Sequence, residues 1–165
     1  MPDIAIQVQS VTKRFGTKTV LDGICLDVYR GETLVILGGS GSGKSTLLRL
    51  MIGNESVDGG KILIDGKNLA EMSEAELTAY RNSIGVLFQS GALFNSMTVA
   101  DNVALPLREH TDLPESTIEI MVKIKLELVG LREHAHKMPA ELSGGMKKRA
   151  GLARAIALDP KILFY

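Results

Sequence analysis

The chain has 165 residues, of which 45% are hydrophobic and 23% are charged, and its formal net charge is zero. This length allows one domain with a substantial core, and the neutral balance argues against a disordered chain or a protein built to coat nucleic acid. No hydrophobic run approaches the roughly 18 residues of a membrane span, and the N-terminus has no signal-peptide pattern. The single cysteine, Cys25, fits a reducing cytosol.

Two stretches near the N-terminus alternate between hydrophobic and polar residues. The first contains Ile4, Ile6 and Val8 and is expected to end in a turn over residues 11–16, and the second covers residues 20–29. Such alternation is typical of half-buried strands. We therefore expect a small antiparallel sheet beside a parallel core.

The next segment is a glycine-rich loop between a predicted strand and a predicted helix. Residues 33–37 are hydrophobic and rich in β-formers, as in a buried parallel strand, and residues 47–52 predict a helix that Gly53 ends. Between them, residues 38–46 match the pattern G-x-x-x-x-G-K-[ST] at every fixed position. This order of strand, glycine loop and helix indicates a phosphate-binding loop.

The residue types of the loop suit a nucleotide with Mg²⁺. Glycines let successive N–H groups point at one anion, and the helix that follows presents the positive end of its dipole. Lys44 is expected to reach the β- and γ-phosphates, and the Ser45 hydroxyl is expected to coordinate Mg²⁺. The predicted nucleotide-binding residues here are Gly38, Gly39, Ser40, Gly41, Ser42, Gly43, Lys44, Ser45 and Thr46.

After this loop the chain returns to β-structure before a second core strand. Residues 61–67 predict a strand, and Ser73 with Glu76 forms a capping box that opens a helix. Residues 84–88 predict a buried strand with Gln89 at its carboxyl end. Ligands of parallel sheets bind at that edge, which makes Gln89 a candidate site residue.

From residue 91 to residue 157 the pattern becomes helical. A helix over residues 99–105 is expected to end at Pro106, because proline lacks the N–H that an inner turn needs. A later helix opens at residues 141–145, and residues 161–165 start a further buried strand.

The stretch from residue 115 to residue 129 has an ambiguous period. Its hydrophobic residues alternate as in a strand, yet Ile120, Ile124 and Leu128 also recur at helical spacing. A strand of that length is rare, and Gly130 stands where a helix C′ glycine belongs, so we expect a helix.

The Leu-Ser-Gly-Gly run at residues 142–145 follows the phosphate loop and Gln89 along the chain. With these three motifs in this order, the sequence resembles the ATP-binding subunits of ABC transporters over its whole length. The resemblance implies an α/β fold with a P-loop NTPase (RecA-like) core and parallel sheet, a small antiparallel β subdomain and a helical signature subdomain. Within one nucleotide-binding domain over 1–165, the implied parts are an antiparallel part (1–32 and 61–70), a core (33–58, 71–90 and 158–165) and a helical part (91–157).

The resemblance also implies roles for residues that match the family's motifs. Phe15 takes the place of the aromatic residue that stacks on adenine. Gln89 takes the place of the glutamine that contacts Mg²⁺ and the attacking water. Lys44 and Gln89 are thus the implied catalytic residues. The signature residues Ser143, Gly144 and Gly145 are similar to those that bind the γ-phosphate of ATP held by the opposite subunit. The resemblance therefore implies a head-to-tail dimer that holds two ATP molecules at its interface.

Two positions depart from the family pattern. Gly39 replaces the proline usual after the first loop glycine, a change that the backbone tolerates. Met146 replaces the glutamine that usually ends the signature, which removes one polar contact. The serine and both glycines of the signature remain.

A narrower resemblance is to the Mla-type ATPases. It rests on Met146 and on residues 87–94, 101–104 and 106–111. Such subunits bind the cytoplasmic face of a membrane permease and, with a lipid-binding MCE protein, move phospholipids. The alternatives are a soluble ABC ATPase without a transport role and a nucleotide-binding regulator that does not hydrolyse ATP. No nucleic-acid partner is expected.

The family's Mg²⁺-binding aspartate and general-base glutamate would fall just beyond Tyr165. The 165 residues therefore match a C-terminally truncated cassette. From this we expect the chain alone to hydrolyse ATP slowly or not at all.

Overall fold

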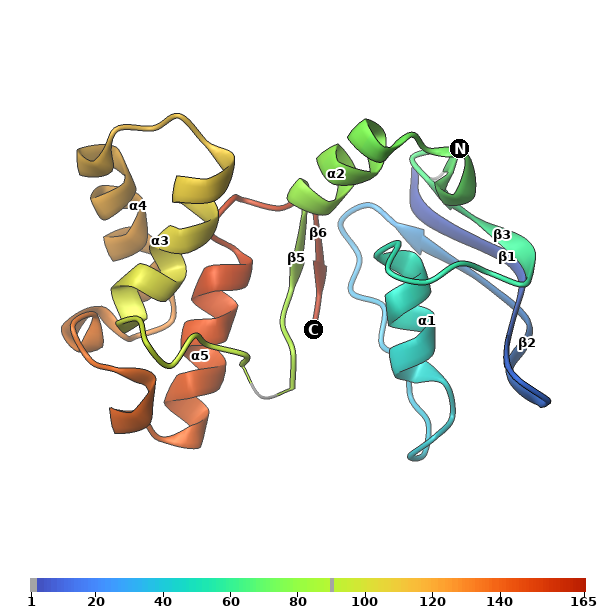
Figure 1. Ribbon diagram of the computed structural model, residues 1–165, viewed down its shortest axis with the longest axis horizontal. Helices are drawn as coiled ribbons and strands as arrows, with labels where there is room; N and C mark the ends of the chain where they lie inside the picture. Colours follow the sequence, from blue (N-terminus) through green and yellow to red (C-terminus); the bar gives the residue numbers. More distant parts are fainter. Residues whose placement is uncertain (1–2, 90) are drawn as a thin grey trace. The chain divides into compact units, whose positions relative to one another are not determined.

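The computed structural model describes residues 3–89 and 91–165, and the chain divides into an N-terminal unit that ends at Arg81 and a C-terminal unit that begins at Asn82 (Figure 1). The fold is mixed α/β, as the sequence predicted. It combines a four-stranded antiparallel sheet, a pair of parallel strands and five α-helices among the described residues.

The N-terminal unit is built on the antiparallel sheet. Its strands are β1 (Ile4–Phe15), β2 (Lys18–Tyr29), β3 (Gly59–Ile64) and β4 (Lys67–Asn68), in the order β2-β1-β3-β4. Alternate residues of β1 and β3 are buried, as half-buried strands require. The core of this unit contains Ala5, Ile6, Val8, Val11, Leu21, Leu47, Leu50, Met51, Ile52, Ile62, Ile64 and Tyr80.

Two expected boundaries in this sheet are wrong. Residues 11–15 of the predicted turn are strand, and the chain turns only in a two-residue hairpin loop after β1, in which Gly16 takes a φ of 59°. The predicted strand over residues 61–67 is a hairpin, because Asp65 and Gly66 both have positive φ, as a type I′ turn requires.

Both predicted helices of this unit form, although the first begins at Lys44 and not at residue 47 as predicted. Helix α1 (Lys44–Met51) ends in a Schellman motif, in which Gly53, with a φ of 74°, donates to the Leu50 carbonyl. Helix α2 (Glu74–Asn82) begins with the capping box. The Ser73 N–H donates to Glu76 Oε2 at 3.0 Å, and the Glu76 N–H donates to Ser73 Oγ at 3.3 Å.

The strand expected over residues 33–37 does not form. This segment has no ladder partner among the described residues, and Leu34, Val35, Ile36 and Leu37 are exposed, Leu37 to 88%. A strand is stable only when a neighbour satisfies its backbone groups. The sheet of the N-terminal unit is completed by β1–β4, and the other core strands belong to the C-terminal unit.

The C-terminal unit joins a parallel strand pair to a helical bundle (Figure 1). Strand β5 (Ile84–Val86) pairs in parallel with β6 (Ile162–Phe164), so both predicted core strands are confirmed. Helices α3 (Val99–His110), α4 (Glu115–Leu128) and α5 (Gly144–Ala155) pack on one another. Their shared core is Val99, Val103, Ala104, Leu107, Ile118, Val122, Leu126, Leu131, Leu142, Ala150, Ala153 and Ala157.

The predicted helix end at Pro106 is wrong, because α3 continues for another turn to His110. An inner proline costs roughly 3 kcal/mol. The extra turn keeps Leu107 buried in the bundle core, a gain of about 1.5–3 kcal/mol, and the Thr111 hydroxyl donates to the Leu107 carbonyl at 2.6 Å. Packing therefore offsets the lost backbone bond.

The helix expected over residues 115–129 is confirmed as α4. Gly130, with a φ of 64°, ends it in a Schellman motif. Its buried hydrophobic residues are Ile118, Val122 and Leu126, with Lys125 buried beside them, whereas Ile120, Ile124 and Leu128 are exposed. The helical period was therefore predicted correctly, but on the wrong set of residues.

The described residues also form three short 3₁₀-helices, which are η1 (Leu69–Glu71), η2 (Arg132–His134) and η3 (Pro139–Glu141). Over residues 3–89 and 91–165, none of the helices combines the length and the hydrophobicity needed to cross a membrane.

Candidate nucleotide-binding site

The glycine-rich loop of the N-terminal unit is folded back on itself. The Ser42 N–H donates to the Gly39 carbonyl at 3.3 Å. The Lys44 ammonium donates to the carbonyls of Gly38 and Gly39, both at 2.7 Å, and lies 3.2 Å from Ser42 Oγ. The lysine therefore lies over its own loop and donates to uncharged oxygen atoms. The charged oxygens of a phosphate would be stronger acceptors for the same ammonium group.

One glycine of this loop is required by its backbone geometry, and a second is confined by a neighbouring side chain. Gly43 has a φ of 91°, and a Cβ there would lie 2.7 Å from Leu21 Cδ2 and 3.0 Å from the Val20 carbonyl oxygen. A Cβ at Gly38 would lie 2.6 Å from Ser42 Oγ. The loop therefore adopts a conformation that side chains at these positions would disturb.

The start of α1 is open to an anion. Its N-cap residue, Gly43, supplies no side-chain cap, and no acidic residue stands in the first turn. The first N–H groups of a helix have no intrahelical partner and carry the positive end of its dipole. Ser45 is exposed in this turn, so its hydroxyl is accessible beside these N–H groups.

Phe15, the predicted adenine-stacking residue, lies at the end of β1 and is 47% exposed. The ammonium of Lys13 lies 5.4 Å from its ring centroid. Lys13 is itself buried, donates to the Ser56 carbonyl at 2.7 Å and pairs with Asp58 at 3.7 Å. The contact of Lys13 with Phe15 could not be predicted from the sequence, because the neighbours of Lys13 on the chain give no signal of it.

The signature residues form the start of α5 in the C-terminal unit. Ser143 is the N-cap, and its Oγ accepts from the Met146 N–H at 3.3 Å. Gly144 and Gly145 are exposed, and a Cβ at either would have no heavy atom within 4 Å. Gln89 is also exposed and follows β5, and on either side of it along the chain the Gly91 N–H donates to the Phe88 carbonyl at 2.8 Å.

The five α-helices differ in the charge of their first turns. Helices α2, α3 and α4 carry acidic residues there, namely Glu74 and Glu76, Asp101, and Glu115. Helices α1 and α5 carry none. Because a carboxylate at a helix start occupies the dipole that an external anion would use, only the two motif helices keep their N-termini available.

The described part of the chain contains no group of three or more His, Cys, Asp and Glu side chains placed to hold a metal ion. A Mg²⁺ ion does not need such a group, since it keeps several waters and binds nucleotide phosphates with one or two protein oxygens. The exposed Ser45 hydroxyl and Gln89 side-chain oxygen are donors of the type that Mg²⁺ prefers.

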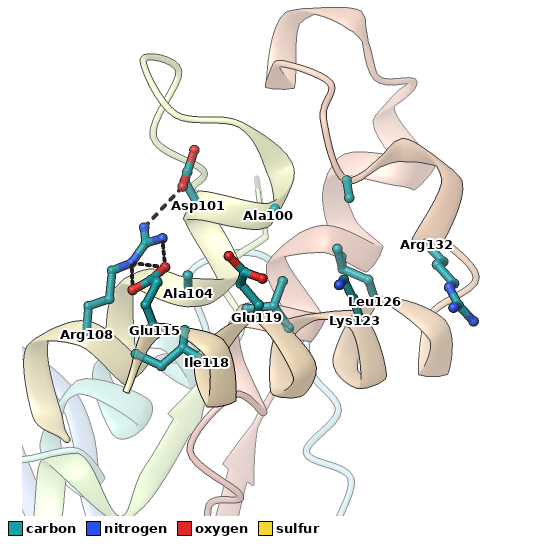
Figure 2. Close-up of a pocket in the computed structure, with 12 residues that line it drawn as sticks. Ala100, Asp101, Ala104, Arg108, Glu115, Ile118, Glu119, Lys123, Leu126 and Arg132 are labelled. Carbon is teal, nitrogen blue, oxygen red and sulfur yellow. Dashed lines mark hydrogen bonds and ion pairs between the residues drawn. The ribbon is translucent and has the colours of Figure 1, made fainter. Parts of the chain in front are cut away.

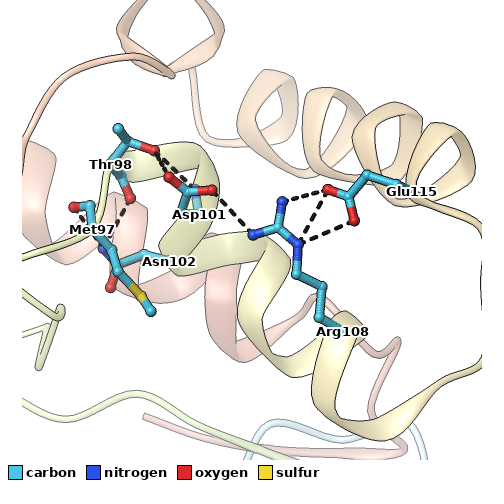
Figure 3. Close-up of polar contacts among 6 residues, drawn as sticks. All are labelled: Met97, Thr98, Asp101, Asn102, Arg108 and Glu115. Atoms are coloured by element: carbon cyan, nitrogen blue, oxygen red, sulfur yellow. Dashed lines mark hydrogen bonds and ion pairs between the residues drawn. The ribbon is translucent and has the colours of Figure 1, made fainter.

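A separate hollow of about 130 Å³ lies between α3, α4 and η2 (Figure 2). Its base is hydrophobic, with Ala104, Ile118 and Val122, and its rim is charged. On that rim Arg108 donates to Asp101 at 3.1 Å and pairs with Glu115 (Figure 3). The Thr98 hydroxyl and then Arg108 hold the pKa of Asp101 below its usual range. None of the predicted site residues lines this hollow.

Comparison with known sequences identifies the family. The profile of the ABC transporter family matches residues 21–165. The chain therefore belongs to the ABC transporter family. Its predicted resemblance to the Mla-type ATP-binding proteins is also confirmed, by identities near 50% over 97% of the chain.

Three relatives illustrate the match. The chain is 51% identical to the probable ribonucleotide transport ATP-binding protein mkl of Mycobacterium leprae, covering 97% of this chain and 46% of that protein. It is 50% and 49% identical to the intermembrane phospholipid transport system ATP-binding proteins MlaF of Escherichia coli K12 and Haemophilus influenzae, again over 97% of the chain and over 60% and 61% of theirs. The chain thus spans about half to three fifths of these relatives.

Solved structures agree on the fold. The ATP-binding cassette MJ0796, in a dimeric post-hydrolysis state bound to ADP and Pi, matches with a TM-score of 0.86 and 31% identity, over 96% of this chain and 72% of that one. CbiO1 from Clostridium perfringens, part of the ABC transporter complex cbiONQ, matches with a TM-score of 0.87 and 32% identity, over 98% and 64%.

Proposed function

We propose that this chain is the ATP-binding and ATP-hydrolysing subunit of an ABC transporter that powers phospholipid movement through a membrane permease. The observation that carries the proposal is the closed glycine loop, with Lys44 folded over it at a helix start that has no acidic residue. Family membership and the identity to the MlaF proteins support the transport role and the cargo.

In this proposal ATP occupies the loop over residues 38–46. Its phosphates replace the two carbonyls as acceptors for Lys44, which stabilises the charge on the transferred phosphoryl group. Ser45 and Gln89 would hold Mg²⁺, which neutralises phosphate charge when bound. Gln89 also orients the attacking water, and the half-exposed Phe15 ring stacks on adenine.

Ser143, Gly144 and Gly145 bind the γ-phosphate of ATP held by a second copy, in a head-to-tail dimer. The exposure of this helix start and its lack of an acidic residue support that role. Two solved structures of the similar cassette MJ0796 are described as dimeric.

The partners proposed are a membrane permease on the inner face of the cytoplasmic membrane and an MCE-type lipid-binding protein. The names of the relatives favour two different cargoes, since mkl is described as a probable ribonucleotide transport protein and MlaF as a phospholipid transport protein. Lipid analysis of the complex co-purified from membranes tests this choice. We expect bound phospholipid. Membrane-free purification with ribosomes or DNA would contradict the transport role.

Nucleotide binding is tested with a fluorescent ATP analogue in the presence of Mg²⁺. The change K44A removes a charged hydrogen-bond donor to the phosphates and should weaken the affinity roughly 10- to 100-fold. The matched control is K61A, which removes an exposed lysine of β3 outside the loop and should leave the affinity unchanged. Equal affinities of K44A and the unaltered protein would contradict the proposal.

A further inference from the structure

We infer that Arg154 is a positioning residue that fixes the segment after Gln89 to the signature helix, so that Gln89 and the Ser143 helix start move as one body. The inference rests on the proposed roles of Gln89 and of the signature. All the contacts that carry it lie within the C-terminal unit.

Arg154 holds this segment in two ways. Its Nη2 donates to the Gly91 carbonyl at 3.3 Å, two residues after Gln89. Its guanidinium also lies 5.7 Å from the centroid of the Phe94 ring. One side chain near the end of α5 therefore contacts both ends of residues 91–94.

The surroundings of Arg154 are unusual for a charged side chain. It is partly buried, and this burial lowers the pKa of its guanidinium. Arg154 forms no ion pair with a carboxylate of the described residues. Burial of an unpaired charge is unfavourable, so the contacts with the Gly91 carbonyl and the Phe94 ring account for its position.

The backbone of the segment lies directly on α5. A Cβ at Gly151 would lie 2.7 Å from the Gly91 carbonyl oxygen and 2.9 Å from its Cα, and a Cβ at Gly91 would lie 2.7 Å from the Lys147 carbonyl oxygen. A glycine inside a helix costs about 0.5–1 kcal/mol relative to alanine. The close approach of the two backbones explains why α5 has one at position 151.

The far end of the segment is fixed by Asn102, which is fully buried in α3. Its Oδ1 accepts from the Phe94 N–H at 2.8 Å, and its Nδ2 donates to the carbonyls of Phe94, Met97 and Thr98 at 3.1, 3.2 and 2.9 Å. Figure 3 shows this side chain beside Met97 and Thr98. Asn102 thus fixes residues 94–98 to α3, whereas Arg154, the glycine contact and the packing of Leu93 on the bundle core hold residues 91–94.

This arrangement gives a mechanical link between two predicted nucleotide contacts. Ser143 and Arg154 are eleven residues apart on one helix, which corresponds to about 16 Å along its axis. A displacement of the signature end is transmitted by the helix to Arg154, by Arg154 to Gly91, and by the hydrogen bond of the Gly91 N–H to the carbonyl of Phe88, the residue before Gln89.

Hydrogen exchange of the purified full chain tests the inference without requiring hydrolysis. We compare peptides that cover residues 87–98 with peptides that cover α4 in the unaltered protein and in R154M, R154K and F94L. R154M should raise the exchange rate over residues 87–98 about tenfold and leave α4 unchanged, because only the anchored segment opens. R154K keeps the charge and should partly restore protection, and F94L, which removes only the ring, should give a smaller rise of about threefold.

The matched control is K148M, a change on the same helix at an exposed residue, which should match the unaltered protein. A second readout is the affinity for the fluorescent ATP analogue with Mg²⁺, which R154M should leave within about twofold because Lys44 and the loop over residues 38–46 are unchanged. A general loss of folding would instead lower this affinity and raise exchange over α4 as well.

Unchanged exchange over residues 87–98 in R154M would overturn the inference. An equal rise over α4 would also overturn it, since Arg154 would then support the whole bundle. If the unaltered protein binds no ATP analogue, the proposed function fails, and the exchange comparison still decides whether Arg154 fixes the segment.

Discussion

Two helices of this chain begin in glycine-rich segments, and they begin in different ways. At α1 the glycines are required by the backbone, since Gly43 has a φ of 91° and no room for a Cβ. At α5 the glycines are not confined, and Ser143 caps its own helix. The first start is a concave loop that closes around its lysine, whereas the second is an exposed end that presents N–H groups to solvent.

The difference indicates how each start can hold an anion. The loop before α1 is folded back on itself with the charged Lys44 side chain held over it, so we expect it to bind phosphate without a second surface. The start of α5 offers N–H groups and a hydroxyl on one side only, and it needs a second surface to enclose a ligand. That requirement supports the proposed role of the signature toward a nucleotide held by another copy.

The largest expected difference in stability comes from adding one methyl group at the start of α1 and, separately, at the start of α5. G43A forces a side chain into the left-handed region and against Leu21, so it should lower the free energy of unfolding by about 3 kcal/mol. G144A meets open space at a helical position and should change stability by less than about 0.5 kcal/mol. Urea unfolding of both variants measures this.

Binding of the ATP analogue should follow the same order. G43A should lose most of its affinity because the loop can no longer close, and G144A should retain it in the monomer. If G43A and G144A had equal stability and equal affinity, the glycines at the start of α1 would be no more confined than those at the start of α5.

Local signals in the sequence predicted much of the fold. The capping box at Ser73 and Glu76 and the helix-ending glycines at 53 and 130 were correct, because each motif depends on hydrogen bonds between near neighbours. The errors at Pro106 and over residues 33–37 depend on packing and on strand pairing far along the chain. A local pattern does not contain that information.

The candidate site shows the same division. The residues of the loop and of the signature could be named from their spacing, since backbone geometry imposes those glycines. The contacts of Arg154 with Gly91 and Phe94 join residues about 60 positions apart, and no spacing rule indicates them. The buried Asn102 was missed for a different reason. Nothing in the helical pattern distinguishes a polar residue that serves a loop from one that faces solvent.

A smaller effect is expected from placing an acidic residue at the start of α5. M146E puts a carboxylate at the third helical position, where with Ser143 it completes a capping box like that of α2. The change should raise the free energy of unfolding by about 0.5–1 kcal/mol, because the carboxylate interacts with the helix dipole. ATP-dependent dimerisation, measured by analytical ultracentrifugation, should weaken roughly tenfold because the γ-phosphate meets a like charge.

The control for this prediction is M146Q, which can make the same hydrogen bond without the charge. We expect M146Q to keep or improve dimerisation while it gains less stability than M146E. If M146E dimerises as well as M146Q, the start of α5 does not bind an anion, and the proposed role of the signature is wrong.

The smallest expected effect concerns α2, whose start is already occupied by its own carboxylate. The hydrogen bond from Lys67 and then those from Ser73 lower the pKa of Glu76 from 4.5 to about 2. Because the pKa is lower in the folded state, the stabilisation is fully present above about pH 4.5 and is lost as the pH falls toward 2. E76Q should therefore unfold more easily than the unaltered protein at pH 6.5, and the difference should shrink at pH 3.

The control is E74Q, in the same turn, which removes one charge without touching the capping box. Its effect on the urea midpoint should be smaller at pH 6.5. Added salt should reduce the effect of E76Q, because Lys67 and Glu76 are exposed and their attraction is screened. If E76Q and E74Q behave alike, the Glu76 carboxylate does not occupy the start of α2. The absence of acidic residues from the first turns of α1 and α5 would then no longer indicate that these two helices bind anions.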